Sequence, residues 1–598
     1  MKMDIVSRIR KIVQDAIFEN YQLQVEDQLI LVNETKQEFE GNYTVVLFAF
    51  VKSLKKSPEI LGKELGEILI SKSPGFFSAF NVIKGFLNLT ITDIVWIDFL
   101  HQHHHANDFG RKERNGKKVM VEYSSPNTNK PLHLGHLRNN FLGWSVAEIY
   151  KANGYDIVKT CIANDRGIHI CKSMIAWKLF ANGATPQSTN TKGDHFVGHY
   201  YVLFGKEYKK QVQELVAKGM TQEEAEKNAP IMMEAQQMLV DWEAGKPDVI
   251  ELWQTMNSWV YAGFEATYKR IGTDFDKIYY ESNTYLHGKD LVEDGLKKNV
   301  FFKKEDGSIW IDLTDEGLDQ KIVQRKDGTA VYITQDIGLA VQKFEEFKPD
   351  LSIYVVADEQ NYHFKVLKLI CQKLKIPSAN GIYHLSYGLV ELPTGRMKTR
   401  EGTVVDADDL IDEMVRISQQ HTEELGKVQD FNFEELKELY DIIGLGALKF
   451  YLLRVDPKKK MVFNPEESID FHGFTGPFVQ YTYARIKSIL RREQIFNKQQ
   501  TTNNVQSRDL LVLEKAVILN LEKYPSTIEQ ACLEMNPSLI ANYAFNLAKI
   551  FNSFYAEHSV SKAETEEKKQ LRLQMCQLTA IVLRSSMSLL GSKVPERM

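Results

Sequence analysis

The chain has 598 residues, 43% of them hydrophobic and 26% charged, and its formal net charge is −5. This is the composition of a globular protein long enough for about three or four domains. The negative charge argues only weakly against a nucleic-acid partner, because local basic patches make the phosphate contacts. Five cysteines show no metal-type pairing, which suggests free thiols in a reducing compartment. No apolar run is long enough to cross a bilayer and no signal peptide is evident, so we expect a cytoplasmic protein without membrane contact.

The first part of the chain, residues 1–110, has the pattern of a small α/β domain. Apolar residues three and four apart predict a helix over Val6–Phe18, and a second helical stretch is predicted over Val45–Ile70. Alternation over Phe86–Ile91 indicates a half-buried strand. We interpret the histidine cluster at 101–105 as part of a solvated linker, because histidines adjacent in sequence rarely converge on one ion.

The next part, residues 111–405, has the pattern of a Rossmann-like parallel sheet. The sequence predicts a strand over Val119–Tyr123, a helix from about His133 to Asn153, and a strand over Ile157–Ile162. Strand, helix and strand with short turns form a βαβ unit. A second α/β half follows, with a strand predicted over Leu351–Ala357, a helix over Tyr362–Leu374 and a strand over Ile382–Leu392.

Helical segments account for the rest of the chain. A charged, helix-favouring stretch predicts an inserted helical region over about 180–300. From Asp406 onward we expect helices throughout. A connecting segment would cover 406–465 and an all-α domain 466–598.

The strongest chemical signal is the run Pro131–His136, which is predicted at a strand-to-helix turn. His133 and His136 share the first helical turn with unpaired backbone N–H groups and the positive end of the helix dipole, which suits the phosphates of ATP. Gly135 lets a nucleotide approach the backbone. Taken alone, this run could equally be a buried turn with satisfied hydrogen bonds. The chain contains no P-loop and no well-placed dinucleotide-binding fingerprint.

This turn resembles the His-x-Gly-His signature of class I aminoacyl-tRNA synthetases and related nucleotidylyl transferases, and Gly395–Gly402 resembles their second, lysine-containing loop. The resemblance implies ATP contacts from four loop residues: Met397, Lys398, Thr399 and Arg400. A cationic loop helps pyrophosphate leave, and here Lys398 and Arg400 carry the charge. The loop departs from the family pattern because its closing serine is missing, which leaves open which base contacts pyrophosphate. Lys130 is a further candidate.

Two longer runs resemble arginyl-tRNA synthetases: Glu122–His133 is similar to the segment before their first motif, and Asp327–Asp336 to their arginine-binding helix. The resemblance implies an arginine-binding set of Glu122, Asn127, Tyr332, Asp336 and Gln360. A guanidinium is planar, always charged and rich in donors, so its recognition requires fixed carboxylates. We expect Glu122 and Asp336 to supply them. An isolated acid such as Asp336 is more often a surface residue paired with a lysine.

Both ends of the chain also resemble this family. Ser468–Tyr481 and Leu589–Met598 are similar to its α-helical anticodon-binding domain, and the N-terminal unit resembles its extra domain, which contacts the tRNA elbow. Tyr481 and Arg485 begin an aromatic and basic stripe that could stack on unpaired tRNA bases. Such a stripe is, by itself, more often core plus solvated face.

The resemblance implies an enzyme that activates L-arginine with ATP, accompanied by Mg²⁺, and esterifies arginine onto tRNA(Arg). We expect a monomer, a need for bound tRNA during activation, and no tightly bound metal. His133 and His136 would stabilise phosphate charge, while Asn127 and Lys130 position the substrate carboxylate and phosphates. The alternatives are a glutamyl or cysteinyl synthetase, a nucleotidylyl transferase, and a catalytically silent tRNA-binding protein.

Overall fold

The computed structural model describes residues 4–36, 38–285, 288–329, 331–393, 405–424, 426, 431–496 and 509–598. The chain forms two compact units, each built from separate stretches of sequence. The first comprises residues 1–109, 486–523 and 549–581, and the second comprises 110–485, 524–548 and 582–598. No helix in the described ranges is long and apolar enough to span a membrane.

The first unit begins with an antiparallel sheet in the order β1-β2-β4-β3. Its strands are β1 (Val32–Glu34), β2 (Tyr43–Val46), β3 (Phe77–Ile83) and β4 (Phe86–Ile91). Its helices are α1 (Ile5–Tyr21), α2 (Phe48–Leu54), α3 (Pro58–Lys72) and α4 (Asp93–His103). The helix predicted from Val6 and the strand from Phe86 are confirmed. The helix predicted from Val45 was wrong at its start, because the β-branched Val45 and Val46 extend and pair with Leu87 and Phe86.

The histidine cluster after this sheet lies partly in a helix. Because α4 extends through His103, the interpretation of the whole cluster as a linker was wrong. Trp96 and Leu100 are fully buried on the same helix and hold it in place. The helix that these apolar residues hold in place therefore includes the first three residues of the cluster.

The second unit contains, among its described residues, a five-stranded parallel sheet in the order β12-β11-β5-β6-β7. Its strands are β5 (Lys118–Glu122), β6 (Asp156–Ala163), β7 (Lys277–Tyr280), β11 (Leu351–Ala357) and β12 (Ile382–Tyr387). The strand order reverses between β5 and β11. In such doubly wound sheets ligands bind in the crevice at the carboxyl ends of the strands beside this reversal. The predicted parallel sheet is confirmed. Its strand order predicts a site at the carboxyl ends of β5 and β11.

The predicted strand ending at Leu392 is interrupted. It divides into β12 and β13 (Val390–Glu391), and β13 pairs with β14 (Met461–Val462). Gly388 lies between the two strands, and a Cβ there would meet the backbone of Lys459 at 2.7 Å. The expectation of helices alone beyond Asp406 was therefore wrong at β14.

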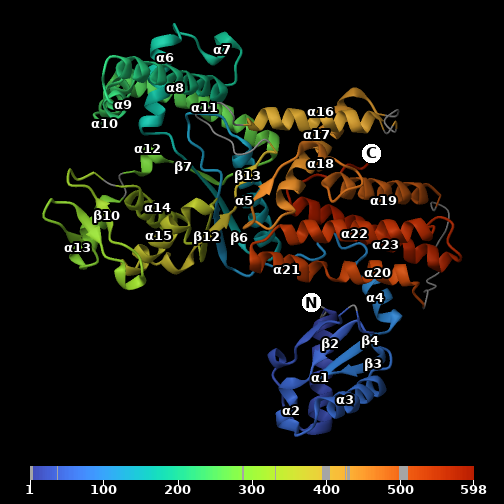
Figure 1. Ribbon diagram of the computed structural model, residues 1–598. Coiled ribbons are helices and arrows are strands. Elements are labelled where there is room, and N and C mark those ends of the chain that lie inside the picture. Colours follow the sequence, from blue (N-terminus) through green and yellow to red (C-terminus); the bar gives the residue numbers. More distant parts are fainter. Residues whose placement is uncertain are drawn as a thin grey trace. The chain divides into compact units, whose positions relative to one another are not determined.

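Helices surround the sheet and form the insertion, as Figure 1 shows. They are α5 (Leu134–Ala152), α6 (Ile168–Phe180), α7 (Pro186–Thr189), α8 (Gly193–Ala217), α9 (Gln222–Asn228), α10 (Pro230–Glu243), α11 (Pro247–Ile271), α12 (Glu281–Thr284), α13 (Lys289–Lys297), α14 (Tyr332–Phe347) and α15 (Asn361–Lys373). The helical insertion is thus confirmed. A small antiparallel sheet follows it, which local periodicity did not predict. Its strands are β8 (Phe302–Lys303), β9 (Ile309–Ile311) and β10 (Lys321–Gln324).

The last third of the chain is mainly helical, as predicted. Its helices are α16 (Ala407–Glu424), α17 (Phe433–Leu453), α18 (Pro465–Ser468), α19 (Gly476–Phe496), α20 (Val512–Glu522), α21 (Tyr524–Glu534), α22 (Ser538–Glu557) and α23 (Glu566–Leu589). Helix α5 joins this region to the sheet within the second unit, because the Ser145 hydroxyl donates to the carbonyl of Leu589 at 2.7 Å.

Candidate active site

The backbone turns sharply where the central strand β5 ends. Ser124 and Ser125 both have left-handed φ angles, 76° and 46°. Asn139 of α5 accepts from the Ser124 N–H at 2.5 Å, and the Tyr268 hydroxyl lies 2.7 Å from Ser124 Oγ. Left-handed conformations of non-glycine residues are uncommon and persist where the surroundings hold them, often at functional sites. The strand end is thus fixed from outside by buried polar contacts.

The histidine turn that follows begins α5 and is held by its own side chains. His133 is the N-cap, and its Nδ1 accepts from the Gly135 N–H at 3.1 Å, while Nδ1 of His136 accepts from the His133 N–H at 3.2 Å. A Cβ at Gly135 would lie 3.0 Å from the His133 ring. Glycine therefore leaves room for the His133 ring.

Both imidazoles of this turn are neutral near pH 7. Burial, with Lys130 nearby, lowers the pKa of His133 to about 3, and burial together with His133 holds the pKa of His136 well below its usual range. A neutral imidazole has one donor and one acceptor nitrogen. Because each Nδ1 accepts from the backbone, each Nε2 carries the proton. The turn offers two Nε2–H donors suited to phosphate oxygens.

The other predicted phosphate-side residues differ in exposure. The Lys130 side chain is partly buried, and burial lowers its pKa. Asn127 is exposed and forms a parallel bridge with Asn164 just beyond the ends of β5 and β6. Both follow β5 directly, so the chain brings them to the same end of the sheet as His133.

Glu122 is the last residue of β5, and its side chain is already engaged. It is only 7% exposed, and its Oε2 pairs with the ammonium of Lys343 on α14. Lys343 was not predicted as a site residue. Its position seven residues after Asp336 puts both on one face of a helix, which is the signal that could have identified it.

Asp336 is likewise paired, through Oδ2, with Nε2 of His363 at 2.6 Å. Tyr332 begins the same helix and is 74% exposed. Gln360 ends the turn after β11 and is also exposed. Gln360 thus lies at the carboxyl end of β11, and the pair with His363 brings Asp336 there as well, whereas the Tyr332 side chain is exposed to solvent.

A further carboxyl group, which the sequence interpretation missed, lies in this region. Glu281 begins α12, directly after β7, and burial raises its pKa to about 7; Arg166 opposes the rise, while Asp165 and Asp336 add to it. Asp165 is 1% exposed and accepts from the Ser282 N–H at 2.8 Å. The position of Glu281 at a strand's carboxyl end was the available signal.

The second motif, with the predicted ATP contacts Met397, Lys398, Thr399 and Arg400, lies outside the described residues. The segment after it pairs with the histidine turn: His133 and Asp406 form an antiparallel bridge, and the Leu134 N–H donates to Val405 at 3.2 Å. Asp408 then accepts from Lys192 at 2.6 Å. The insertion thus holds the segment that continues from the second motif.

The same cluster has the donor types of a cation site. Asp194, His195 and Asp408 converge closely enough to bind a metal. The Lys192 ammonium, however, lies 3.0 Å from Asp194 and 2.6 Å from Asp408, and its Nζ donates to Thr267 at 2.6 Å. A lysine therefore already supplies the positive charge that these acids require.

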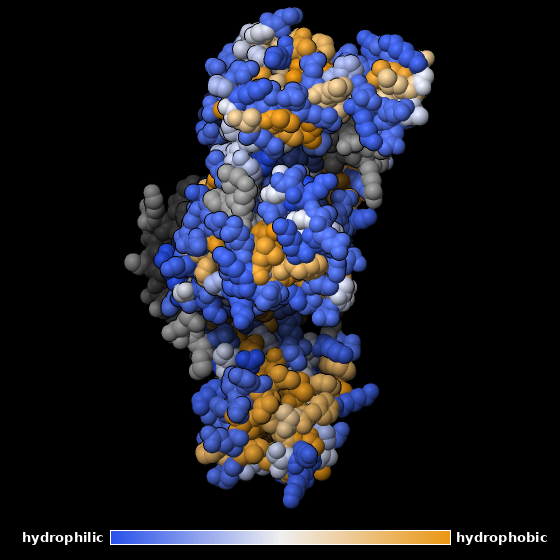
Figure 2. Space-filling model, turned by 90° about the vertical axis from the view of Figure 1, so that its left-hand side faces the viewer, coloured by the Kyte–Doolittle hydropathy of each residue, from blue (hydrophilic) through white to orange (hydrophobic). Residues whose placement is uncertain are grey.

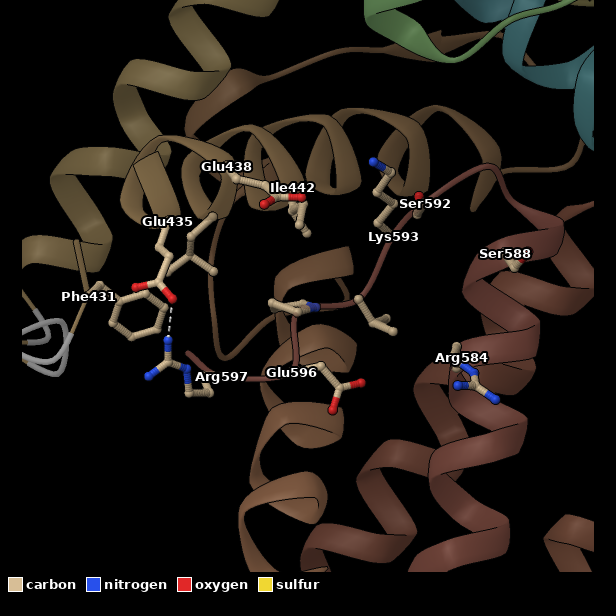
Figure 3. A pocket seen from close by; sticks show the side chains of 13 residues that line it. Phe431, Glu435, Glu438, Ile442, Arg584, Ser588, Ser592, Lys593, Glu596 and Arg597 are labelled. Atoms are coloured by element: carbon tan, nitrogen blue, oxygen red, sulfur yellow. Dashed lines mark hydrogen bonds and ion pairs between the residues drawn. The ribbon is translucent and has the colours of Figure 1, made fainter. Parts of the chain in front are cut away.

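The predicted tRNA-binding pair lies on α19, where the Arg485 guanidinium is 4.9 Å from the centre of the Tyr481 ring. Within the same unit, the start of α17, the end of α23 and the C-terminal tail enclose a pocket of about 530 Å³ (Figure 3). Its walls carry charges of both signs. Arg597 pairs with Glu435 at 2.8 Å and lies over Phe431, 4.5 Å from the ring centre.

Comparison with known proteins agrees with this architecture. Three family models match the chain: the arginyl tRNA synthetase N-terminal domain over residues 5–91, the catalytic domain of class I tRNA synthetases (R) over 100–464, and the DALR anticodon binding domain over 479–598. The solved arginyl-tRNA synthetase of Thermus thermophilus has the same fold, with a TM-score of 0.77 at 23% identity over 99% of this chain and 100% of that one.

Curated relatives are similar along their whole length. The arginine–tRNA ligase of Bacteroides thetaiotaomicron is 51% identical over 97% of this chain and 97% of its own, and that of Porphyromonas gingivalis is 49% identical over 100% of both. Together with the catalytic-domain match over more than half of the chain, these similarities show that the chain belongs to the arginyl-tRNA synthetase family.

Proposed function

We propose that this protein is an arginine–tRNA ligase, which activates L-arginine with ATP and transfers it to the terminal adenosine of tRNA(Arg). The proposal rests on the groups at the carboxyl end of the parallel sheet, at the point where the strand order reverses between β5 and β11. There Glu122 ends one strand, Gln360 follows the other, and the neutral histidine turn begins after the first. Cation-binding and phosphate-binding groups thus occur together.

In the first step, a carboxylate oxygen of arginine attacks the α-phosphorus of ATP, and the bond to the departing pyrophosphate breaks. The Nε2–H groups of His133 and His136 donate to phosphate oxygens as charge develops on them. Since both rings are neutral, they act as hydrogen-bond donors, and Lys130 supplies positive charge. Mg²⁺ enters with ATP, bound mainly by phosphate oxygens and water. We keep Lys398 and Arg400 as contacts to the departing pyrophosphate, because the loop that contains them resembles the second motif of the family.

The acidic groups define the amino-acid substrate. We assign Asp336 and Glu281 to the guanidinium and Glu122 to a second polar contact, with Asn127, Tyr332 and Gln360 at the rim. A fixed set of carboxylates discriminates against lysine, which lacks the guanidinium fork, and against citrulline, which lacks the charge. Binding alone then suffices for specificity, so no editing step is needed.

In the second step, a ribose hydroxyl of the tRNA's terminal adenosine attacks the arginyl carbonyl and AMP leaves. We assign tRNA contacts to Tyr481 and Arg485 on α19.

The N-terminal segment also exposes aromatic rings. Phe48 and Phe86 are 53% and 40% exposed, and their ring centres are 5.5 Å apart. Figure 2 shows apolar side chains gathered at the lower end of the view, where this segment lies. Exposed aromatic rings suit stacking on unpaired bases. We place the enzyme in the cytoplasm as a monomer.

The proposal is tested by ATP–pyrophosphate exchange against all twenty amino acids, with and without total tRNA. We expect exchange with arginine alone, and only when tRNA is present. Exchange with another amino acid would overturn the pocket assignment. Absence of exchange under every condition, with tRNA still bound, would instead identify a silent tRNA-binding protein.

A further inference from the structure

Lys343 is among the most deeply buried cations that the structure describes, with 1% of its surface exposed. It lies on α14, and its ammonium contacts Oε2 of Glu122. The ring centres of Tyr354 and Tyr279 are 4.7 and 5.6 Å from its Nζ. Burying a lysine is costly unless it is paired. The surroundings of Lys343 thus fix the ammonium against one particular carboxylate.

Only one oxygen of that carboxylate is used. The pair engages Oε2 of Glu122, and Oε1 has no hydrogen-bond partner among the residues that the structure describes. An ionised carboxylate can accept at both oxygens. The pair therefore holds the carboxylate in one orientation and leaves one acceptor for another donor.

Helix α14 supplies both halves of this arrangement. Asp336 and Lys343 are seven residues apart, about two helical turns, and so lie on the same face. Tyr354 on β11 lies in the electrostatic field of both Glu122 and Asp336. One helix thus presents an acid to the site and, two turns further on, the cation that holds a second acid.

We propose that Lys343 is a positioning residue for arginine binding, which orients Glu122 and balances its charge so that Oε1 accepts from the substrate. This inference rests on the proposed function. The charge balance has a second consequence, because Glu122 ends β5 just before the phosphate-binding turn. An unbalanced carboxylate there would repel the phosphates of ATP.

The test compares four variants in the arginine-dependent exchange assay: Lys343→Met, Lys343→Arg, Glu122→Gln and the double variant Lys343→Met/Glu122→Gln. Losing a hydrogen bond to a charged group corresponds to roughly a 10- to 100-fold loss of binding. We therefore expect Lys343→Met and Glu122→Gln each to raise the arginine KM by at least about tenfold, with a smaller change in kcat. Lys343→Arg, which keeps the charge, should stay within about threefold of the unmodified enzyme. Lys365→Met, at an exposed lysine of α15, is the matched control.

The double variant keeps the test decisive if Lys343→Met alone does not fold. Replacing both members of a buried pair by neutral groups leaves no uncompensated charge and is often tolerated. If Lys343 acts through Glu122, the double variant has the arginine KM of Glu122→Gln, within about twofold. A further tenfold rise in the double variant would overturn the inference. So would an unchanged arginine KM in a folded Lys343→Met enzyme whose Tm alone is lowered.

The two proposals fail in different ways. If the unmodified protein shows no exchange with arginine, the proposed function itself is wrong. If it shows exchange and Glu122→Gln has an unchanged arginine KM, Glu122 is not part of the arginine site and the inference is overturned. If Glu122→Gln raises the arginine KM but Lys343→Met does not, Glu122 binds arginine without being positioned by Lys343. That result also overturns the inference.

Discussion

Nε2 of His363 lies 2.6 Å from Oδ2 of Asp336, so this carboxylate is oriented before any substrate arrives. The two residues come from successive helices: α14 precedes β11 in the sequence, and α15 follows it. A carboxylate held at one oxygen can accept from a guanidinium with the other. The arrangement repeats that of Glu122, which is held in the same way by Lys343.

The first prediction concerns this acid. Asp336→Asn keeps the shape and removes the charge, so we expect the arginine KM to rise by about two orders of magnitude, as for the loss of a charged hydrogen bond in a partly buried site. The tRNA dissociation constant should stay nearly unchanged. Glu345→Gln, an exposed acid on the same helix, is the control. An unaltered KM in Asp336→Asn would remove this residue from the pocket.

The second prediction concerns the histidine turn. His136→Ala removes one preorganised donor to the phosphates, and we expect activation to slow by roughly 10²-fold or more. Because both rings are already neutral, the rate should not depend on their ionisation between pH 6 and 8. Single-turnover formation of arginyl-adenylate measures the step directly. Normal activation in this variant would refute the assigned role.

Local patterns in the sequence predicted the elements and the histidine turn well. The βαβ unit from Val119 to Ile162 depends on alternation and on a helix with its own N-cap, and both are encoded within a few residues. The resemblance to a known family then supplied the remaining candidate residues. Two of them lie where such a fold places binding residues. Glu122 is the last residue of the parallel strand β5, and Asp336 lies in the first turns of α14.

The partners of these candidates could not be predicted. Lys343 is 221 residues from Glu122 in sequence, and Lys192 is 216 residues from Asp408. No local period encodes such a distance, since packing of separate elements sets it. The very short strands around Ile309 were missed for a related reason, because two to four residues show no measurable alternation.

The third prediction concerns the pH dependence of arginine binding. Burial raises the pKa of Glu281 to about 7, so this carboxyl is protonated below that pH and ionised above it. The ionised form attracts the guanidinium, and the arginine KM should therefore fall by about tenfold as the pH rises from 6 to 8. Glu281→Gln should bind arginine weakly at every pH. A KM that does not vary with pH in the unmodified enzyme would contradict the assignment.

The fourth prediction concerns stability. The hydrogen bond to Asp408 raises the pKa of His195, so the folded protein binds this proton more tightly than the unfolded chain. The stabilisation is fully present below the unfolded pKa of about 6.5 and is lost as the pH rises through the folded value. His195→Gln should thus lower Tm more at pH 6 than at pH 9. Scanning calorimetry at both values measures this, with the exposed His199→Gln as control.

The fifth prediction concerns tRNA. Stacking of a base on an aromatic ring contributes about 1–3 kcal/mol, so Tyr481→Ala should raise the tRNA KM in aminoacylation by about tenfold or more. Tyr481→Phe keeps the ring and should remain within about threefold, which separates stacking from hydrogen bonding through the hydroxyl. The arginine KM at saturating tRNA should be the same in both variants, because Tyr481 lies on α19 and not at the ends of the parallel strands. If Tyr481→Ala changed the arginine KM and left the tRNA KM unaltered, the residue would belong to the structural support of the catalytic domain and not to a tRNA-binding surface.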